Sequence, residues 1–194
     1  MSFYPPEVQK RFDSPQRAGI VESANADGRS ASFQCGAFVA FSLSIDASSK
    51  MVVEARFQTN GCGYMVAGAD ALAEFIRGQG LSELHGLDDG ELNSKLDGVF
   101  SVVPGDRRQC IDVCIGALKA TLADFRARQI AEFNGEKALV CTCFGVTEET
   151  IEKILDSGSI RTVDEVSRIC NAGHGCGSCR MLIQEMVDTF SEVG

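Results

Sequence analysis

The sequence predicts an α+β fold in two parts: a larger part in which helices pack on a small antiparallel sheet, and a smaller, helical part. Three observations support this prediction. Alternating and β-branched residues mark two strands, Phe33–Ile45 and Met51–Thr59, on either side of a turn at Asp46–Lys50. Helical periodicity takes over from Tyr64. The short polar stretch Asn134–Lys137, which contains a glycine, separates the two parts.

In the larger part, helices are expected before and after the strands. Pro5 and Pro6 suit the first turn of a short helix, Tyr4–Phe12, because a missing N–H costs little there. In the second strand, Val53, Ala55 and Phe57 are expected to share one face. Helical periodicity predicts a helix at Tyr64–Arg77 and a long amphipathic helix at Arg107–Phe133. Between them, the sequence predicts short helical or turn pieces at Leu81–Leu84, Gly86–Gly90 and Glu91–Lys95, and a loop at Val99–Gly105.

The smaller part shows helix signals and no strand pattern. Thr147 is the expected N-cap of a helix that runs through Asp156 and is ended by Gly158, and Thr162 is the expected cap of Val163–Cys170. A glycine-rich loop at Asn171–Gly177 and a final helix at Ser178–Phe190 complete the part. The predicted domains are therefore residues 1–133 and 138–194.

The charge and hydropathy of the chain exclude several classes of function. The 194 residues carry a net charge of −9; Met1–Phe133 has 13 basic and 17 acidic residues, and Asn134–Gly194 has 5 and 10. With both parts acidic, nucleic-acid binding through phosphate contacts is not expected. No apolar stretch is long enough for a membrane span, and Met1–Arg11 lacks the apolar core of a signal peptide, so a cytoplasmic location is expected.

The chain contains nine cysteines. In a chain with no secretion signal, metal binding or redox chemistry explains such a number better than disulfides do. An odd total also fits a simple disulfide framework poorly. The cysteines therefore carry the functional prediction.

Four of them form two close pairs near the C-terminus. Cys141-Thr142-Cys143 is a C-x-C motif and Cys176-Gly177-Ser178-Cys179 is a C-x-x-C motif, with 32 residues between them. Four thiolates in two such pairs can enclose a 2Fe–2S cluster or a tetrahedral zinc ion. The spacing leaves both alternatives open, although zinc sites more often use two C-x-x-C-like pairs.

The same segment resembles a known family. Val140–Val146, with its C-T-C-F-G-V, and Gly173–Met181, with its G-H-G-C-G-S-C-R-M, are similar to the bacterioferritin-associated-ferredoxin (BFD) type of 2Fe–2S domain. The resemblance covers about Leu139–Glu192. It implies a small all-α fold and a permanent 2Fe–2S cluster with four cysteine ligands: Cys141, Cys143, Cys176 and Cys179.

Three further cysteines lie where elements of the larger part begin or end. Cys35 is expected at a strand start, Cys62 at the strand-to-helix break and Cys110 in the first turns of the long helix. Helix N-termini favour thiolates, so these positions suit metal binding, but three cysteines in a core are also unremarkable.

Family resemblance favours the metal-binding interpretation of these three cysteines. The segment around Cys62, A-R-F-Q-T-N-G-C-G, is similar to the second cysteine region of NifU/IscU-type scaffolds, and Ser14–Gly19 resembles their N-P-R-N-x-G. Cys35-Gly36-Ala37 and Gln109-Cys110 resemble the other two cysteine regions. The resemblance implies a small antiparallel sheet packed by helices. It also implies a transient 2Fe–2S or 4Fe–4S cluster, or iron, held by Cys35, Cys62 and Cys110.

The fourth ligand of this transient site is open. Ala37 replaces the aspartate and Gln109 the histidine that the resemblance would place there. Cys114 lies one helical turn after Cys110 and could supply the missing thiolate; alternatively, it simply fills the apolar stripe of the helix. A cluster that bridges two protomers, and hence a homodimer, is a further alternative.

The expected function is a non-enzymatic iron–sulfur cluster assembly scaffold that delivers clusters to apo-proteins. The resemblance implies a cysteine desulfurase and apo iron–sulfur proteins as partners. It also implies an Hsp70-type chaperone, whose docking segment is here reduced to Val103-Pro104-Gly105. The main alternative is a 2Fe–2S electron-transfer module with an N-terminal docking domain. A zinc-dependent sulfurtransferase is disfavoured because Ala37 removes its aspartate ligand.

Overall fold

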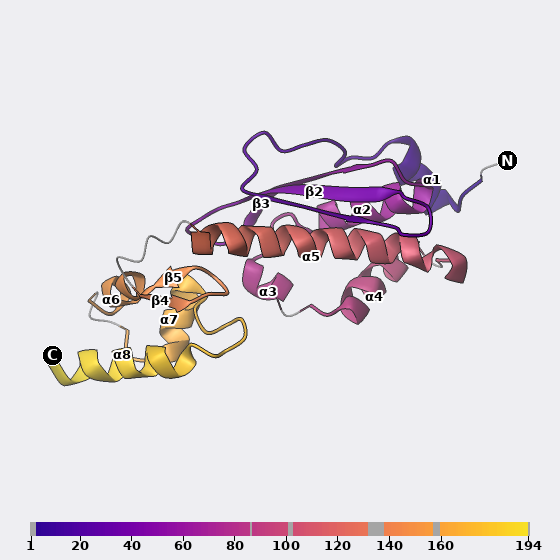
Figure 1. The fold of residues 1–194 in the computed structure, drawn as a ribbon. Helices are drawn as coiled ribbons and strands as arrows, with labels where there is room; N and C mark the ends of the chain where they lie inside the picture. Colours follow the sequence, from indigo (N-terminus) through magenta and orange to yellow (C-terminus); the bar gives the residue numbers. More distant parts are fainter. Residues whose placement is uncertain (1–2, 86, 101–102, 132–137, 157–159, 194) are drawn as a thin grey trace. The chain divides into compact units, whose positions relative to one another are not determined.

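The computed structural model describes all residues except 1–2, 86, 101–102, 132–137, 157–159 and 194 (Figure 1). The predicted linker, 134–137, and the helix end predicted at Gly158 lie outside the described residues. Two compact units form: the first comprises Met1–Asp46, Met51–Gly80 and Leu87–Phe125, and the second comprises Ala47–Lys50, Leu81–Gly86 and Arg126–Gly194. The elements are, in order, α1 (Pro6–Asp13), β1 (Ala26–Ala31), β2 (Phe38–Ile45), β3 (Val52–Thr59), α2 (Gly63–Ile76), α3 (Leu81–His85), α4 (Asp89–Phe100), η1 (Gly105–Arg107), α5 (Arg108–Ala131), β4 (Leu139–Cys141), β5 (Val146–Thr147), α6 (Glu148–Asp156), α7 (Val163–Cys170) and α8 (Arg180–Val193).

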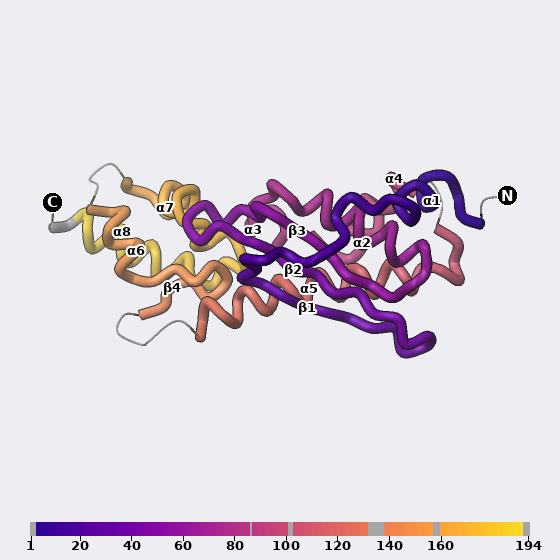
Figure 2. Tube along the Cα trace, turned by 90° about the horizontal axis from the view of Figure 1, so that it is seen from above, coloured from indigo at the N-terminus to yellow at the C-terminus, as the bar shows by residue number. Residues whose placement is uncertain are grey.

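The first unit contains an antiparallel sheet in the order β1-β2-β3. This confirms the predicted small antiparallel sheet packed by helices, because α2 and α5 lie along the same face of it (Figures 1 and 2). The strand β1 was not predicted. Its sequence, A-D-G-R-S-A, has only small and polar residues, so it lacks the apolar alternation that reveals a strand.

The strand predicted to start at Phe33 begins five residues later, at Phe38. Residues 32–37 instead form a tight turn, in which the Ser32 amide donates to the Ala37 carbonyl at 2.7 Å and the Gly36 amide donates to the Ser32 carbonyl at 2.9 Å. Gly36 has φ +69°, a conformation that glycine adopts without steric cost. The turn therefore lifts Cys35 out of the sheet and exposes it.

The predicted face of β3 is partly wrong. Ala55 and Phe57 are buried, but Val53 is 55% exposed and Val52 is buried in its place. The register explains the exchange: Ser44 pairs with Glu54 while Ile45 pairs with Val52, so Val53 is an extra, bulged residue.

The helices α1, α2 and α5 agree with the predicted segments to within two residues at each end. The boundary predicted between the pieces 86–90 and 91–95 is wrong, because one helix, α4, runs from Asp89 through the second piece to Phe100. A buried ion pair fixes α1 to α2, because Arg11 contacts the fully buried Asp70 at 2.6 Å. The second carboxylate oxygen of Asp70 accepts the amide of Arg17 at 2.8 Å, so this buried charge has partners on both oxygens.

Gly28 permits the closest contact between the sheet and α5. A Cβ atom at this position would lie 2.2 Å from the backbone nitrogen of Thr121. We expect Gly28→Ala to lower the free energy of unfolding of the first unit by about 3 kcal/mol, because helix backbone cannot yield as a side chain can. Gly98→Ala is the matched control: it adds the same methyl group on α4 with no atom within 4 Å, and it should stabilise by up to about 1 kcal/mol. Urea unfolding measures both, and equal effects would contradict the close packing.

The second unit is mainly helical, but the prediction that it contains no strand is wrong. β4 and β5 pair as a two-stranded antiparallel sheet around the Cys141–Val146 turn. With three and two residues, these strands are too short to produce a detectable periodicity. The two caps were predicted correctly: Thr162 forms a capping box with Glu165, and the Thr147 hydroxyl accepts the Thr150 amide at 3.4 Å.

Candidate metal-binding cysteine sites

In the first unit, the fold brings two distant cysteines into contact. The sulfur atoms of Cys62 and Cys110 lie 3.6 Å apart, although 48 residues separate them in the chain. Cys62 is the N-cap of α2 and Cys110 lies in the first turn of α5. Both thiols therefore lie at helix N-termini, where the helix dipole favours the thiolate that binds metal.

The corner between β3 and α2 fixes the position of Cys62. The Thr59 hydroxyl donates to the Phe38 carbonyl at 2.5 Å and accepts the Gly61 amide at 3.0 Å. The Asn60 side chain accepts the Phe38 amide at 2.8 Å. These bonds tie the corner to the start of β2 and so fix the residues directly before Cys62.

Cys35 lies on the exposed turn before β2 and differs from the other two cysteines in its electrostatics. The Ser32 hydroxyl and the Ala37 backbone lower the pKa of the Cys35 thiol. Burial, then the neighbouring Cys62, and finally the charge of Cys35 together raise the pKa of Cys110 to about 12. Cys35 is thus the more readily ionised thiol, whereas Cys110 needs a cation beside it before it loses its proton.

Two neighbours of this site were missed by the sequence analysis. The Tyr4 hydroxyl accepts the amide of Gly63, directly after Cys62, at 3.1 Å, and its ring packs so closely that a Cβ on Gly63 would lie 2.5 Å from it. Arg107 lowers the pKa of Cys110. Only Arg107 had a usable signal, since it precedes Cys110 by three residues on one helical turn.

Cys114 lies in the core and not on the surface of the site. It is fully buried, and its thiol donates to the Cys110 carbonyl at 3.1 Å and to the Met65 carbonyl at 3.5 Å. Burial raises the pKa of the Cys114 thiol strongly. These contacts favour the apolar-stripe alternative, and a role as fourth ligand stays a prediction.

A Cys114→Ala variant separates these two roles. We expect it to retain the full cluster absorbance of the first unit and to lose about 1 kcal/mol of stability through the small cavity that it leaves. Visible absorbance after cluster reconstitution, together with urea unfolding, measures both effects. Loss of absorbance at unchanged stability would instead make Cys114 a ligand.

In the second unit, the structure brings the four predicted cysteines together as two pairs. The sulfur atoms of Cys143 and Cys176 lie 3.5 Å apart, and Cys179 forms a side-chain hydrogen bond with Cys141. Each pair takes one cysteine from the C-x-C motif and one from the C-x-x-C motif. The first pair is the more accessible, since Cys176 is exposed and Cys143 half-buried, while Cys141 and Cys179 are buried.

Glycines and backbone amides shape the surroundings of these pairs. A Cβ on Gly175 would lie 2.9 Å from the Cys143 sulfur, so only glycine allows this approach. Backbone hydrogen bonds from Gly173, Cys176 and Ser178 reach the sulfur atoms of three of these cysteines, Cys143, Cys176 and Cys179, and favour their thiolates. The Ser178 hydroxyl lies 3.4 Å from the Cys176 sulfur.

The pKa values of the thiols follow their burial. Hydrogen bonds from Ser178 lower the pKa of Cys176 to about 7. Burial raises the pKa of Cys143, and burial together with Cys141 raises that of Cys179 to about 11. The Cys176 thiol therefore ionises readily in the free protein, whereas the Cys143 and Cys179 thiols require the charge of a bound metal.

This donor set fits a 2Fe–2S cluster better than a single zinc ion. In the described part of the chain, no group of three or more Cys, His, Asp or Glu side chains has the geometry to hold one metal ion. A tetrahedral zinc ion needs all four sulfur atoms around one centre. A 2Fe–2S cluster with four cysteines uses two per iron, which matches the observed pairs.

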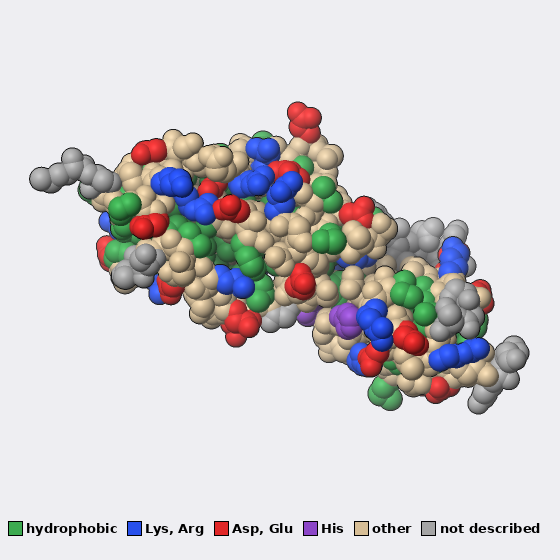
Figure 3. Space-filling view, turned by 180° about the vertical axis from the view of Figure 1, so that it is seen from behind, with side chains coloured by type: hydrophobic (Ala, Val, Ile, Leu, Met, Phe, Trp, Pro, Cys, Tyr) green, Lys and Arg blue, Asp and Glu red, His purple; other side chains and the backbone are tan. Residues whose placement is uncertain are grey.

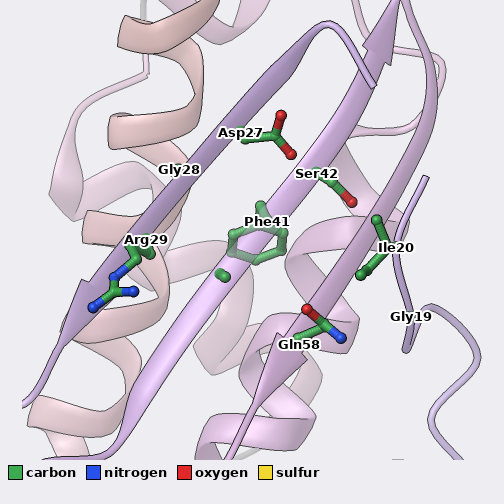
Figure 4. A pocket seen from close by; sticks show the side chains of 9 residues that line it. Gly19, Ile20, Asp27, Gly28, Arg29, Phe41, Ser42 and Gln58 are labelled. Carbon is green, nitrogen blue, oxygen red and sulfur yellow. The ribbon is translucent and has the colours of Figure 1, made fainter. Parts of the chain in front are cut away.

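A cavity of about 290 Å³ in the first unit is separate from the cysteines (Figure 4). Ile20, Ser42 and Gln58 line it from three different segments, and no cysteine lines it. Its lining offers no metal-ligating cluster, so we assign it no role in the cysteine chemistry.

Residues 3–132 match the family described as the NifU-like N terminal domain. The chain belongs to this family. Residues 139–189 match the BFD-like [2Fe-2S] binding domain, so both resemblances seen in the sequence are confirmed. Together the two matches account for both units in the expected order.

Known relatives agree with this assignment. The chain is 29% identical to the nitrogen fixation protein NifU of Trichormus azollae over 97% of its own length, and it spans 64% of that relative. It is 25% identical to the iron-sulfur cluster assembly scaffold protein IscU of Aquifex aeolicus, over 66% of this chain and 80% of that one. The chain thus spans less than two thirds of the NifU relative but most of the IscU relative.

Solved structures confirm the fold of the first unit. The N-terminal part of a NifU-like protein from Brucella abortus superposes with a TM-score of 0.50 at 13% identity, covering 63% of this chain and 94% of that one.

In the described part of the chain, no helix combines the length and the apolar character that crossing a membrane requires.

Proposed function

We propose that this protein is an iron–sulfur cluster assembly scaffold that carries a permanent 2Fe–2S cluster in its second unit. The observation that carries the proposal is the contact between Cys62 and Cys110 at 3.6 Å. A fold of the NifU/IscU type creates this contact at two helix N-termini. Cys35 is exposed and its charge raises the pKa of Cys110, so a third thiol is available to a cluster under construction.

The three thiols suit a cargo that must arrive and leave. Cys35 is exposed and its pKa is lowered, so it can meet incoming iron or sulfur first. Cys62 and Cys110 would bind the other side of the cluster, because the N-termini of α2 and α5 fix their positions. Three ligands give a less complete enclosure than four, and an incompletely enclosed cluster is easier to transfer to an apo-protein.

In the second unit, Cys141, Cys143, Cys176 and Cys179 would hold the resident cluster, which supplies single-electron transfer when bound. Cys141 and Cys179 provide the buried side, and Cys143 and Cys176 the accessible side. The amides of the glycine-rich loop stabilise the thiolates, and Gly175 lets the backbone approach them. We infer that this accessible side is where electrons enter or leave.

The proposed partners are a cysteine desulfurase that supplies sulfur and apo iron–sulfur proteins that receive clusters, with an Hsp70-type chaperone assisting release. We place the protein in the cytoplasm, where nine free thiols remain reduced. The proposal assigns no catalytic residue, because the chain binds and passes on a cargo.

An electron-transfer module with a docking domain is the second candidate. Ala37 and Gln109 favour it, because neither side chain can replace the ligand that the scaffold motif has at these positions. Under this alternative, the first unit would not accept a cluster.

Cluster transfer from the first unit distinguishes the two candidates. A Cys141→Ser, Cys143→Ser variant removes the permanent cluster and leaves the first unit intact. Incubated anaerobically with a desulfurase, cysteine and ferrous iron, it should acquire a cluster and pass it to an apo-ferredoxin. Iron and sulfide content and visible absorbance measure both steps. If the variant binds zinc or nothing, the protein is a small ferredoxin with a docking domain.

A further inference from the structure

Three arginines of the first unit surround one carboxylate, away from the cysteines. Nitrogen atoms of Arg17, Arg56 and Arg77 each lie 3.5 Å from a carboxylate oxygen of Glu54. Arg17 follows α1, Glu54 and Arg56 belong to β3, and Arg77 caps the end of α2. Three segments of the fold thus converge on one anion.

The carboxylate of Glu54 does not neutralise the charge of the three arginines. One negative charge faces three positive ones, and all three contacts are long for charge-assisted hydrogen bonds, which are normally about 2.7–2.9 Å. Among the described residues, the Arg17 Nε and one Glu54 carboxylate oxygen are buried atoms with no hydrogen-bond partner. A buried guanidinium N–H without an acceptor is costly, so the arrangement needs an explanation.

The neighbouring acidic group does not provide the missing acceptor. Asp70 accepts the backbone amide of Arg17, and its other oxygen pairs with Arg11. The Arg56 guanidinium also donates to the Ala18 carbonyl at 3.3 Å, which fixes its direction but leaves its charge unmatched. The excess positive charge therefore remains at the cluster itself.

The arginine cluster around Glu54 is accessible from solvent. Glu54 and Arg56 alternate with the buried Ala55 and Phe57, so they point to the opposite face of β3. The exposed fraction of the side chains rises from 25% for Arg17 to 48% for Arg77. Lys and Arg side chains gather on the face of the first unit shown in Figure 3. A small ligand can thus reach Arg17 past the more exposed arginines.

We propose that Arg17, Arg56 and Arg77 bind a small oxyanion, a polycarboxylate or phosphate, beside Glu54. Planar guanidinium groups match two oxygen atoms of such a ligand at once. The ligand would accept hydrogen bonds from the exposed guanidinium nitrogens of the three arginines and would reduce the excess charge. Glu54 would then repel the ligand and limit its affinity.

The site is distinct from the cysteine site. Glu54 precedes Thr59 by five residues on β3, a distance of about 17 Å along an extended strand, and Cys62 lies still further on. In the N-P-R-N-x-G segment that Ser14–Gly19 resembles, asparagine stands where this chain has Arg17. The site therefore depends on a residue by which this chain departs from that motif.

Isothermal titration of the full chain with citrate and with inorganic phosphate tests the proposal, at constant pH and with ionic strength held constant by chloride. Arg17→Gln should weaken binding about tenfold, which corresponds to about 1.4 kcal/mol. Glu54→Gln should tighten binding by a similar factor. Arg29→Gln removes the same charge from β1, two strands away, and should leave binding unchanged.

Saturable binding of citrate alone would identify a polycarboxylate site, and binding of phosphate alone a phosphate site; both results support the proposal. Absence of saturable binding to the wild type, or an equal loss in Arg29→Gln, would overturn it. Thermal unfolding in chloride alone supplies the folding control. Arg17→Gln should have the wild-type unfolding temperature in chloride. A marked drop in this temperature, with no effect of citrate or phosphate on it, would show that the arginine cluster is only a structural ion pair.

Discussion

Cys110→Ser should abolish the transient cluster of the first unit while leaving the permanent cluster of the second unit in place. Cys110 is one half of the only sulfur–sulfur contact observed between the described cysteines of the first unit, and its thiol is held by the first turn of α5. Serine keeps the size of the side chain but replaces the soft thiolate that iron prefers. We expect transfer of clusters to an apo-ferredoxin to fall at least about a hundredfold, because two remaining thiols cannot retain a cluster during transfer.

The measurement is iron and sulfide content after desulfurase-dependent reconstitution, followed by the rate of apo-ferredoxin activation. Iron should fall to about two atoms per chain, the content of one 2Fe–2S cluster. Cys170→Ala is the control. Cys170 is also buried, but its thiol donates to the Val166 carbonyl in the second unit and belongs to neither site. A Cys110→Ser protein that still transfers clusters at the wild-type rate would remove Cys110 from the scaffold site.

Local sequence signals explain which parts of the sites could be predicted. The C-x-C and C-x-x-C motifs place each cysteine within three residues of its motif partner, so the spacing alone indicates a four-thiolate centre. The structure adds that the contacts run between the motifs, from Cys143 to Cys176, which no local pattern reveals. The contact between Cys62 and Cys110 depends on the whole sheet and two helices.

Features that depend on long-range packing were missed. Tyr4 contacts Gly63 across 59 residues of sequence, and the three arginines around Glu54 come from three segments. The strand β1 carries no apolar alternation because Gly28 must fit against the backbone of α5. In these places, tertiary contacts and not local periodicity determine the structure.

The bulge at Val53 shows how one residue can invert a prediction. A strict period of two would bury Val53 with Ala55 and Phe57, yet the extra residue turns it to solvent and buries Val52. Glu54 and Arg56 alternate with Ala55 and Phe57, so they keep the outward face that a period of two gives them, and the arginine cluster forms there. The local irregularity of the strand thus changes the prediction at Val52 and Val53 and leaves the residues of the proposed anion site where the alternation places them.

Removal of the permanent cluster should unfold the second unit. Its described core is small: Phe144, Ile151, Val166, Ile183 and Val187 are its most deeply buried large side chains. A domain of about 60 residues with so small a core is marginal without a metal, and binding energy at a structural metal centre is folding energy. We therefore expect Cys141→Ser, Cys143→Ser to lower amide protection in α6, α7 and α8 at least about a hundredfold, or about 2.8 kcal/mol.

Hydrogen exchange followed by mass spectrometry measures this loss for each unit in the same molecule. Peptides from β2, β3 and α2 serve as the internal control, because the first unit has its own core around Phe41, Leu72 and Ile111 and should keep its protection. Cys170→Ala provides the matched cysteine control within the second unit. If α6–α8 keep their protection without the two cysteines, the second unit is stable without its cluster, and the prediction is wrong. If protection falls in both units together, the two units unfold cooperatively, and the cluster stabilises the whole chain.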